Sequence, residues 1–289
     1  MRDLNRLRAE AETLASELPE FSVLTRQQAT AHPGGAPRQR AGHGEDFWQY
    51  RGRTPEDSAN AIDWRRSATG DELFIREHEL QTARQMEIWV DPSSGFDWTS
   101  IKGGLTKAEE ARIILTALAY QFCAEGDRAR VLGSGKGAFN AGQVIQKSLE
   151  AFDHPNRSDV PSVPERDSSI VVIASDFYSN MDDMARAISS AASDGASGML
   201  LQICDPMEVE FPFSGRVKFR RPGSTLSRIF GRTEDLKDTY EARFKKRQDA
   251  VRALAARVGW GFETHILGNA RRPLAFRVMQ DLAGAGAPR

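Results

Sequence analysis

Apolar residues follow two alternating patterns along most of the chain, short unbroken runs and longer stretches with helical spacing. The short runs predict buried strands at residues 86–90, 128–132, 170–174, 199–203 and 262–266. Helical spacing predicts helices from a capping box at Thr106 and Glu109 to about residue 122, and at residues 141–152, 184–192, 235–258 and 273–282. Parallel strands need long crossover connections, so this alternation predicts a doubly wound α/β domain with a mostly parallel sheet.

The first 84 residues have a different pattern. Leu4, Leu7, Ala11, Leu14 and Leu18 form one apolar stripe, which predicts a helix that ends near Pro19. We expect this stripe to pack on the chain's own body; docking to another protein is the alternative.

Aromatic and β-prone residues separated by turn signals follow at 47–78 and favour short strands or a hairpin. We therefore predict a helix plus a small β-containing subdomain at residues 1–84 and the α/β domain at residues 85–289. The segment 32–44, with the basic residues His32, Arg38, Arg40 and His43, is expected to be an exposed loop.

Composition excludes several classes of protein. The 289 residues contain 39 Lys and Arg against 40 Asp and Glu, which indicates neither a nucleic-acid partner nor an anionic membrane surface. The apolar runs are far shorter than the roughly 20 residues of a membrane span, and residues 1–10 lack the apolar block of a secretory signal. We expect a cytoplasmic protein without membrane insertion, in which Cys123 and Cys204 are buried free thiols.

The strongest candidate site follows the first predicted strand of the α/β domain, in the sequence Asp91-Pro-Ser93-Ser-Gly95. Ligands of open α/β sheets bind in the crevice beyond the carboxyl ends of the strands. Asp91 and Ser93 are therefore expected to face such a crevice.

Several motifs along the chain resemble one bacterial family, the domain of unknown function fifty-eight. They are Ile-Asp-Trp at 62–64, Trp-Val-Asp-Pro-Ser-Ser-Gly at 89–95, Ser-Asp-Phe at 175–177 and the segment 202–212. The resemblance covers nearly the whole chain after residue 40. It implies a von Willebrand factor A-like fold, an adhesion-type metal site and a working association with MoxR-type AAA+ ATPases. Many relatives also carry membrane helices near the N-terminus.

The metal site that the resemblance implies is incomplete in this sequence. The family-type pattern is Asp-x-Ser-x-Ser, a Thr from a following loop and a later Asp; Asp91, Ser93 and Asp176 match it. Gly95 replaces the second Ser, and the loop at 133–137 offers no Thr but contains Lys136, a possible positive charge near the site. Mg²⁺ or another divalent cation is the candidate ligand, because such ions prefer oxygen donors. Alternatively, Asp91 and Asp176 cap helices or hydrogen-bond the crevice loops.

A second candidate is the loop Gly133-Ser-Gly-Lys-Gly137, which could bind phosphate between a strand and a helix. A P-loop requires a Ser or Thr directly after the Lys and a first Gly upstream of the loop, and this loop has neither. Ser93 lacks the features of an activated nucleophile. We therefore expect a non-catalytic adaptor or assembly cofactor for a MoxR-type AAA+ ATPase. The alternative is a nucleotide-binding enzyme that uses the Gly133–Gly137 loop.

Overall fold

The computed structural model describes residues 4–24, 41–54, 58, 62–68, 70, 72–79, 84–154, 158–163, 169–178, 181–220 and 225–285. The chain divides into two compact units. The first, here called the α/β unit, consists of Met1–His32 and Arg84–Ala287, and the second of Pro33–Ala83 with Pro288–Arg289. Each unit is described by itself.

A five-stranded parallel sheet forms the centre of the α/β unit. Its strands lie in the order β4 (Arg128–Val131), β3 (Gln85–Val90), β5 (Ser169–Ser175), β6 (Ser197–Cys204) and β9 (Gly261–Ile266). All five predicted strands are confirmed, and so is the doubly wound α/β class. The direction of winding reverses between β3 and β5, so the topological switch point lies at the ends of these two strands.

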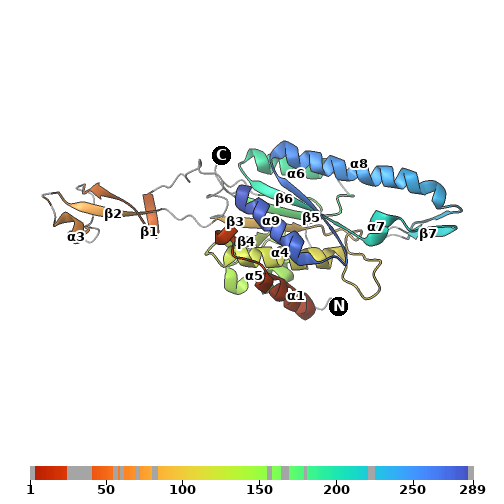
Figure 1. Cartoon of the computed structure of the whole chain (residues 1–289), viewed down its shortest axis with the longest axis horizontal. Helices are drawn as coiled ribbons and strands as arrows, with labels where there is room; N and C mark the ends of the chain where they lie inside the picture. The colour runs from red at the N-terminus through yellow and green to blue at the C-terminus, as the bar shows by residue number, and fades with distance from the viewer. Residues whose placement is uncertain are drawn as a thin grey trace. The chain divides into compact units, whose positions relative to one another are not determined.

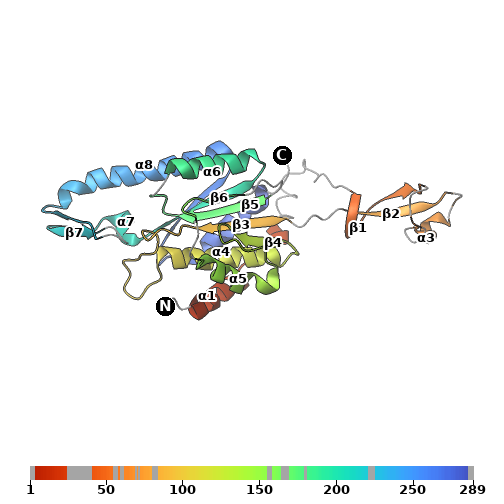
Figure 2. The same ribbon diagram turned by 180° about the vertical axis from the view of Figure 1, so that it is seen from behind.

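Helices cover both faces of this sheet, consistent with a von Willebrand factor A-like arrangement (Figures 1 and 2). One face carries α4 (Lys107–Cys123), α5 (Ala141–Phe152) and α9 (Arg271–Ala285), and the other carries α6 (Met181–Ser193) and α8 (Glu234–Val258). Strand residues alternate between the two cores. Ile88 and Val90 pack on the α4 side, while Trp89 packs on the side of α6 and α8.

The N-terminal helix α1 (Leu4–Glu17) belongs to the α/β unit and packs on α4. Only Glu109 and Tyr120 of α4 escape burial, because the sheet covers one side of this helix and α1 covers the other. Grouping this helix with the β-containing subdomain, as the division at residue 84 did, is therefore wrong. The expectation that its apolar stripe packs on the chain's own body is confirmed.

Three elements between β6 and α8 have no counterpart among the predicted ones. They are the short helix α7 (Pro206–Glu210) and the antiparallel hairpin of β7 (Val217–Arg220) and β8 (Ser227–Phe230). Figures 1 and 2 show α7 and β7 beside the amino-terminal part of α8, at the carboxyl end of the sheet. These elements are short and form a wall around the end of the sheet.

The second unit contains a hairpin and one helical turn. Strand β1 (Ala41–Gly52) pairs antiparallel with β2 (Phe74–Glu79), as the turn signals predicted, and Asp63 caps α3 (Trp64–Ser67). The Arg66 guanidinium lies over the rings of Tyr50 and Phe74. Of the predicted basic loop, residues 32–40 lie outside the described residues, and residues 41–44 begin β1.

Both cysteines are buried free thiols, as predicted. Burial raises the pKa of the Cys123 and Cys204 thiols to about 12, so neither is a reactive thiolate at neutral pH. In the part of the chain that the structure describes, no helix combines the length and the apolar character that a membrane span requires.

Candidate functional site

A cleft of about 680 Å³ opens at the switch point, where Asp91 follows β3 and Asp176 follows β5. The loop after β3, α7, the β7–β8 hairpin and α8 contribute its walls. Its polar residues include Asp91, Ser93, Asp176 and Glu208, and its aromatic residues are Trp98, Tyr178, Phe211, Phe213, Phe219 and Tyr240. The cleft is thus acidic at its inner end and aromatic along its walls, and the exposed bases Lys218 and Arg220 of β7 line its outer part.

The structure brings the three predicted metal ligands, Asp91, Ser93 and Asp176, to this cleft. The Asp91 carboxylate is nearly buried, and both of its oxygens accept hydrogen bonds. The Ser93 backbone N–H donates to Oδ1 at 2.8 Å, and the Ser175 hydroxyl donates to Oδ2 at 2.6 Å. Burial raises the pKa of Asp91, and the nearby Asp176 acts in the same direction, although these hydrogen bonds oppose the shift.

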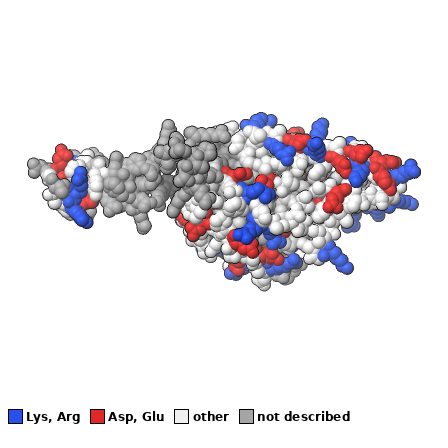
Figure 3. Space-filling view, viewed as in Figure 1, with Lys and Arg blue, Asp and Glu red and all other residues white. Residues whose placement is uncertain are grey.

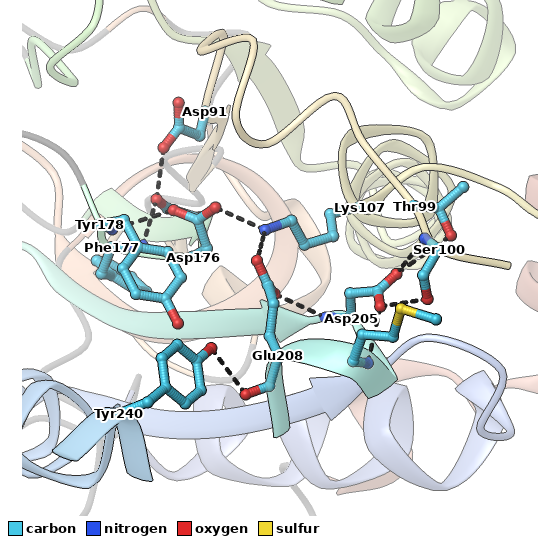
Figure 4. Close-up of polar contacts among 12 residues, drawn as sticks. Asp91, Thr99, Ser100, Lys107, Asp176, Phe177, Tyr178, Asp205, Glu208 and Tyr240 are labelled. Atoms are coloured by element: carbon cyan, nitrogen blue, oxygen red, sulfur yellow. Dashed lines mark hydrogen bonds and ion pairs between the residues drawn. The ribbon is translucent and has the colours of Figure 1, made fainter. Parts of the chain in front are cut away.

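The most unusual residue of the site is Lys107, whose side chain is fully buried. Its Nζ donates to Oδ2 of Asp176 at 2.7 Å and to Oε1 of Glu208 at 2.7 Å, and Figure 4 shows the ammonium pointing between these two carboxylates. Burial alone would lower the pKa of Lys107. The attraction of Asp176 and Glu208 outweighs burial and raises it, so this side chain is charged at neutral pH.

Aromatic rings complete the surroundings of this ammonium. The ring centroids of Phe96, Trp98 and Tyr178 lie 5.8, 5.9 and 5.8 Å from Nζ. These distances fall within the range of cation–π attraction. We call Lys107, Asp176, Glu208 and these three rings the ammonium cage.

Local chain geometry places Lys107 in the cage. Thr106 and Glu109 form the predicted capping box of α4, which makes Lys107 the first residue of that helix. A cation at a helix N-terminus is unfavourable, because the N-terminal end of the helix dipole is positive. The two carboxylates offset this repulsion.

Glu208 reaches the cage because α7 has a capping box of its own. The Asp205 side chain accepts a hydrogen bond from the Met207 N–H, and the Glu208 side chain accepts one from the Asp205 N–H. Asp205 also accepts hydrogen bonds from the backbone and the hydroxyl of Ser100, so the loop after β3 is attached to the end of β6 (Figure 4). Burial raises the pKa of Glu208, although Lys107 opposes the shift.

These residues do not fit a divalent metal ion. Asp176 and Glu208 are already bonded to an ammonium, which would repel a second cation at the same oxygens. Aromatic rings suit an ammonium but provide none of the oxygen ligands that Mg²⁺ requires. Among the described residues, no group of three or more His, Cys, Asp or Glu side chains is arranged to hold a metal.

The sequence offered Lys136 as a positive charge near the site, and the structure places it elsewhere. Lys136 is exposed, does not line the cleft, and acts electrostatically on Glu150 of α5. The cation bonded to the carboxylates of the site is Lys107, which the sequence showed only as a position inside the capping box of a helix.

The Gly133–Gly137 loop does not form a phosphate-binding turn. Beyond it, Phe139 pairs antiparallel with Ala129, near the start of β4, and α5 begins two residues later. The chain therefore runs back along β4 before the helix starts, so the N-terminus of α5 lies away from the glycines. A P-loop requires that helix N-terminus at the glycine loop itself.

The aromatic wall combines ring stacking with unusual backbone. Phe211 stacks on Tyr240 at a centroid distance of 4.6 Å. It also meets Phe213 edge-on and stacks on Phe219. Phe211 and Phe177 have positive φ angles of 43° and 57°, an uncommon conformation for bulky residues. Such strain is concentrated at functional sites.

Sequence reasoning missed Lys107, Asp205 and Glu208. A signal for Lys107 existed: it lies four residues before Ala111 and seven before Ile114, on the apolar face of a helix, and it is a cation in the first helical turn. The Asp-Pro-Met-Glu sequence at 205–208 is likewise a capping-box signature with Pro at the first helical position. No sequence signal would have shown that Glu208 and Lys107 meet.

The surface charge on the face that Figure 3 shows does not single out another site. On the face seen in Figure 3, Lys and Arg are interspersed with Asp and Glu over the α/β unit, in line with the net charge of −1. A mixed surface of this kind produces no strong field of one sign.

Comparisons with known proteins give the family. Among solved structures, the chain is similar to the conserved hypothetical protein BatB from Bacteroides thetaiotaomicron, with 11% identity, a TM-score of 0.38, and coverage of 72% of this chain and 100% of that one. An aerotolerance-related membrane protein from Bacteroides fragilis matches with 11% identity, a TM-score of 0.38, and coverage of 70% and 100%. The comparison with curated proteins gave no significant match. The model of one family, described as protein of unknown function DUF58, matches residues 49–250, and the chain belongs to that family.

Proposed function

We propose that this chain is a non-catalytic protein-interaction module that binds a protein partner in the cleft at the carboxyl end of its sheet. The observation that carries the proposal is the cleft itself, about 680 Å³ in volume and walled by six aromatic side chains. Met207 also lines the cleft, and its side chain is 38% exposed. Aromatic residues and Met are enriched where proteins bind one another.

The proposed partner is a MoxR-type AAA+ ATPase, for which the chain would act as adaptor or assembly cofactor. Support for this partner comes from the family, since the resemblance to domain of unknown function fifty-eight implies such an association. The chemistry of the cleft is compatible with this role. Asp176 and Glu208 bind the ammonium of Lys107, so at the inner end of the cleft apolar surface is the principal contact for a partner, while Lys218 and Arg220 offer charge at the outer wall.

The competing proposal, a nucleotide-binding enzyme, has less support. The glycine loop is separated from the N-terminus of α5 by the return of the chain along β4. A titration with ATP and GTP, followed by thermal unfolding, separates the two functions. We expect no rise in melting temperature; a rise that is lost in Lys136→Ala would favour the enzyme.

The interaction proposal is tested by placing a charge in the cleft. We expect the wild-type chain to co-purify with a MoxR-type ATPase encoded by the same organism. Met207→Glu should weaken binding by about tenfold or more, because burying an unpaired carboxylate in an apolar interface costs at least ~1–3 kcal/mol. Isothermal titration calorimetry measures the change in Kd.

A matched control is Val23→Glu, which adds the same charge at an exposed apolar residue, 42% exposed, outside the cleft. This variant should bind like the wild type. The proposal is wrong if the wild type never associates with such ATPases, with or without Mg²⁺ and nucleotide, or if the two variants weaken binding equally.

A further inference from the structure

The ammonium cage is a complete binding site for a cation that the chain itself provides. Lys107 has no exposed side-chain surface, two carboxylates lie 2.7 Å from its Nζ, and three aromatic rings face it at 5.8–5.9 Å. Carboxylates combined with aromatic faces are the surroundings that proteins use to recognise organic ammonium ions. A hydrated divalent ion would instead require oxygen ligands and room for water.

We propose that Lys107 is the resident cation of the cleft, so that the docking site is assembled without a divalent metal ion. The carboxylates meet at the switch point because β3, β5 and β6 end side by side there. Several buried carboxylates in one place repel one another and require a positive charge. Lys107 supplies this charge from within the fold, whatever the metal concentration around the protein.

The same geometry defines how a partner is recognised. Nζ is buried beneath its own carboxylates, and both oxygens of Asp91 already accept hydrogen bonds from Ser93 and Ser175. Within the described part of the chain, the inner end of the cleft thus presents no free cation to which a partner's Asp or Glu could bind; the exposed cations Lys218 and Arg220 lie on β7, in the outer wall. A partner of the proposed function binds instead by inserting an apolar side chain between the aromatic walls.

The test uses the isolated full chain, so its outcome does not depend on the partner that the proposed function requires. The first measurement is the melting temperature of the wild type with increasing Mg²⁺ or Mn²⁺, for which we expect no rise. Gly95→Ser is the informative second protein, because Gly95 lines the cleft and a Cβ there meets no atom within 4 Å. It restores the missing hydroxyl of the family pattern, and we still expect no rise, since Lys107 remains.

Chemical rescue provides the positive result. Lys107→Ala removes three methylene groups and the ammonium, and n-propylammonium replaces those atoms. We expect this ion to raise the melting temperature of Lys107→Ala in a saturable way and to leave the wild type unchanged. Mn²⁺ should not raise the melting temperature of Lys107→Ala. Lys102→Ala, at an exposed lysine of the preceding loop, is the matched control and should not respond to either ion.

The outcomes separate the two cations clearly. The inference is overturned if Mn²⁺ raises the melting temperature of the wild type or of Gly95→Ser and this rise is lost on Asp91→Ala. It is also overturned if Mn²⁺, but not n-propylammonium, raises the melting temperature of Lys107→Ala. Should Lys107→Ala not fold, refolding in n-propylammonium restores the native circular dichroism spectrum if the inference holds; failure of that ion where Mn²⁺ succeeds overturns it. Loss of partner binding alone would concern the proposed function and not this inference.

Discussion

Lys107 and Glu110 are two of the three buried charged side chains of helix α4 and lie one turn apart, and the difference between them separates a candidate site from a structural contact. Lys107 lies beside the cleft, bonded to Asp176 and Glu208. Glu110 lies between the layers of the fold, where it binds His265 at 3.0 Å and Arg271 at 2.8 Å. Both residues are satisfied, so burial and good hydrogen bonds alone do not identify a site.

The two clusters differ in how well their charges balance. Burial would raise the pKa of Glu110, but hydrogen bonds and electrostatic attraction from His265 and Arg271 outweigh burial and lower it. Arg271 also donates a hydrogen bond to Glu10 of α1. At the cleft, the Lys107 ammonium is bonded to Asp176 and Glu208 but not to Asp91, and burial raises the pKa of both Asp91 and Glu208. Perturbed groups beside a cavity are typical of functional sites, whereas the Glu110 cluster attaches the N-terminal helix to the core.

The largest effect is expected for Lys107→Met, which keeps the length of the side chain and removes its charge. Asp176 and Glu208 would then be buried without a counterion, so the free energy of unfolding should fall by roughly 3–5 kcal/mol at neutral pH. Urea unfolding followed by circular dichroism measures this loss.

Acid provides the internal control for Lys107→Met. Burial already raises the pKa of Glu208 and Lys107 opposes that rise, so without Lys107 the folded state takes up a proton on Glu208 at higher pH, and the deficit should shrink as the pH falls through that raised pKa. A deficit below about 1 kcal/mol at neutral pH would contradict the importance that we give to the ammonium cage.

A smaller effect is expected for Glu110→Gln, the equivalent change in the structural cluster. Arg271 retains Glu10 as a partner and its side chain is 23% exposed, so water and Glu10 compensate part of the loss. We expect the free energy of unfolding to fall by roughly 1–3 kcal/mol, measured in the same way.

The pH dependence of stability identifies the source of that loss. The folded state lowers the pKa of Glu110, so the stabilisation is complete above the ordinary glutamate pKa and is lost as the pH falls through the lowered value. Glu110→Gln should therefore flatten the acidic part of the wild-type stability curve. If the two curves run parallel below neutral pH, Glu110 is not the group that titrates.

The strands of the sheet and the position of the site could be predicted from the sequence, because both depend on local patterns. The apolar runs, the capping box at Thr106 and the acid after each of two strands are properties of neighbouring residues. The order of strands then brings Asp91 and Asp176 to one edge, since β3 and β5 are adjacent and parallel.

The chemistry of the site could not be predicted because it depends on contacts between residues far apart in the chain. Glu208 follows Lys107 by 101 residues, and they meet because β6 lies in the same sheet and because α7 begins where β6 ends. For the same reason, the sequence could not show which helix α1 packs against. One apolar stripe predicts a contact but does not say that α4 provides the other half.

The smallest effect is expected for Tyr240→Phe in the cleft wall. The Tyr240 hydroxyl donates to the backbone carbonyl of Glu208 at 2.9 Å and so links α8 to α7, while its ring stacks on Phe211. The variant keeps the stack and loses one hydrogen bond, so the free energy of unfolding should fall by about 0.5–1.5 kcal/mol. A drop as large as that of Lys107→Met would mean that the wall, and not the ammonium, holds Glu208 in place. If the drop stays within that smaller range, and Mn²⁺ still does not change the melting temperature, the charge of Lys107 is what holds Glu208 in place.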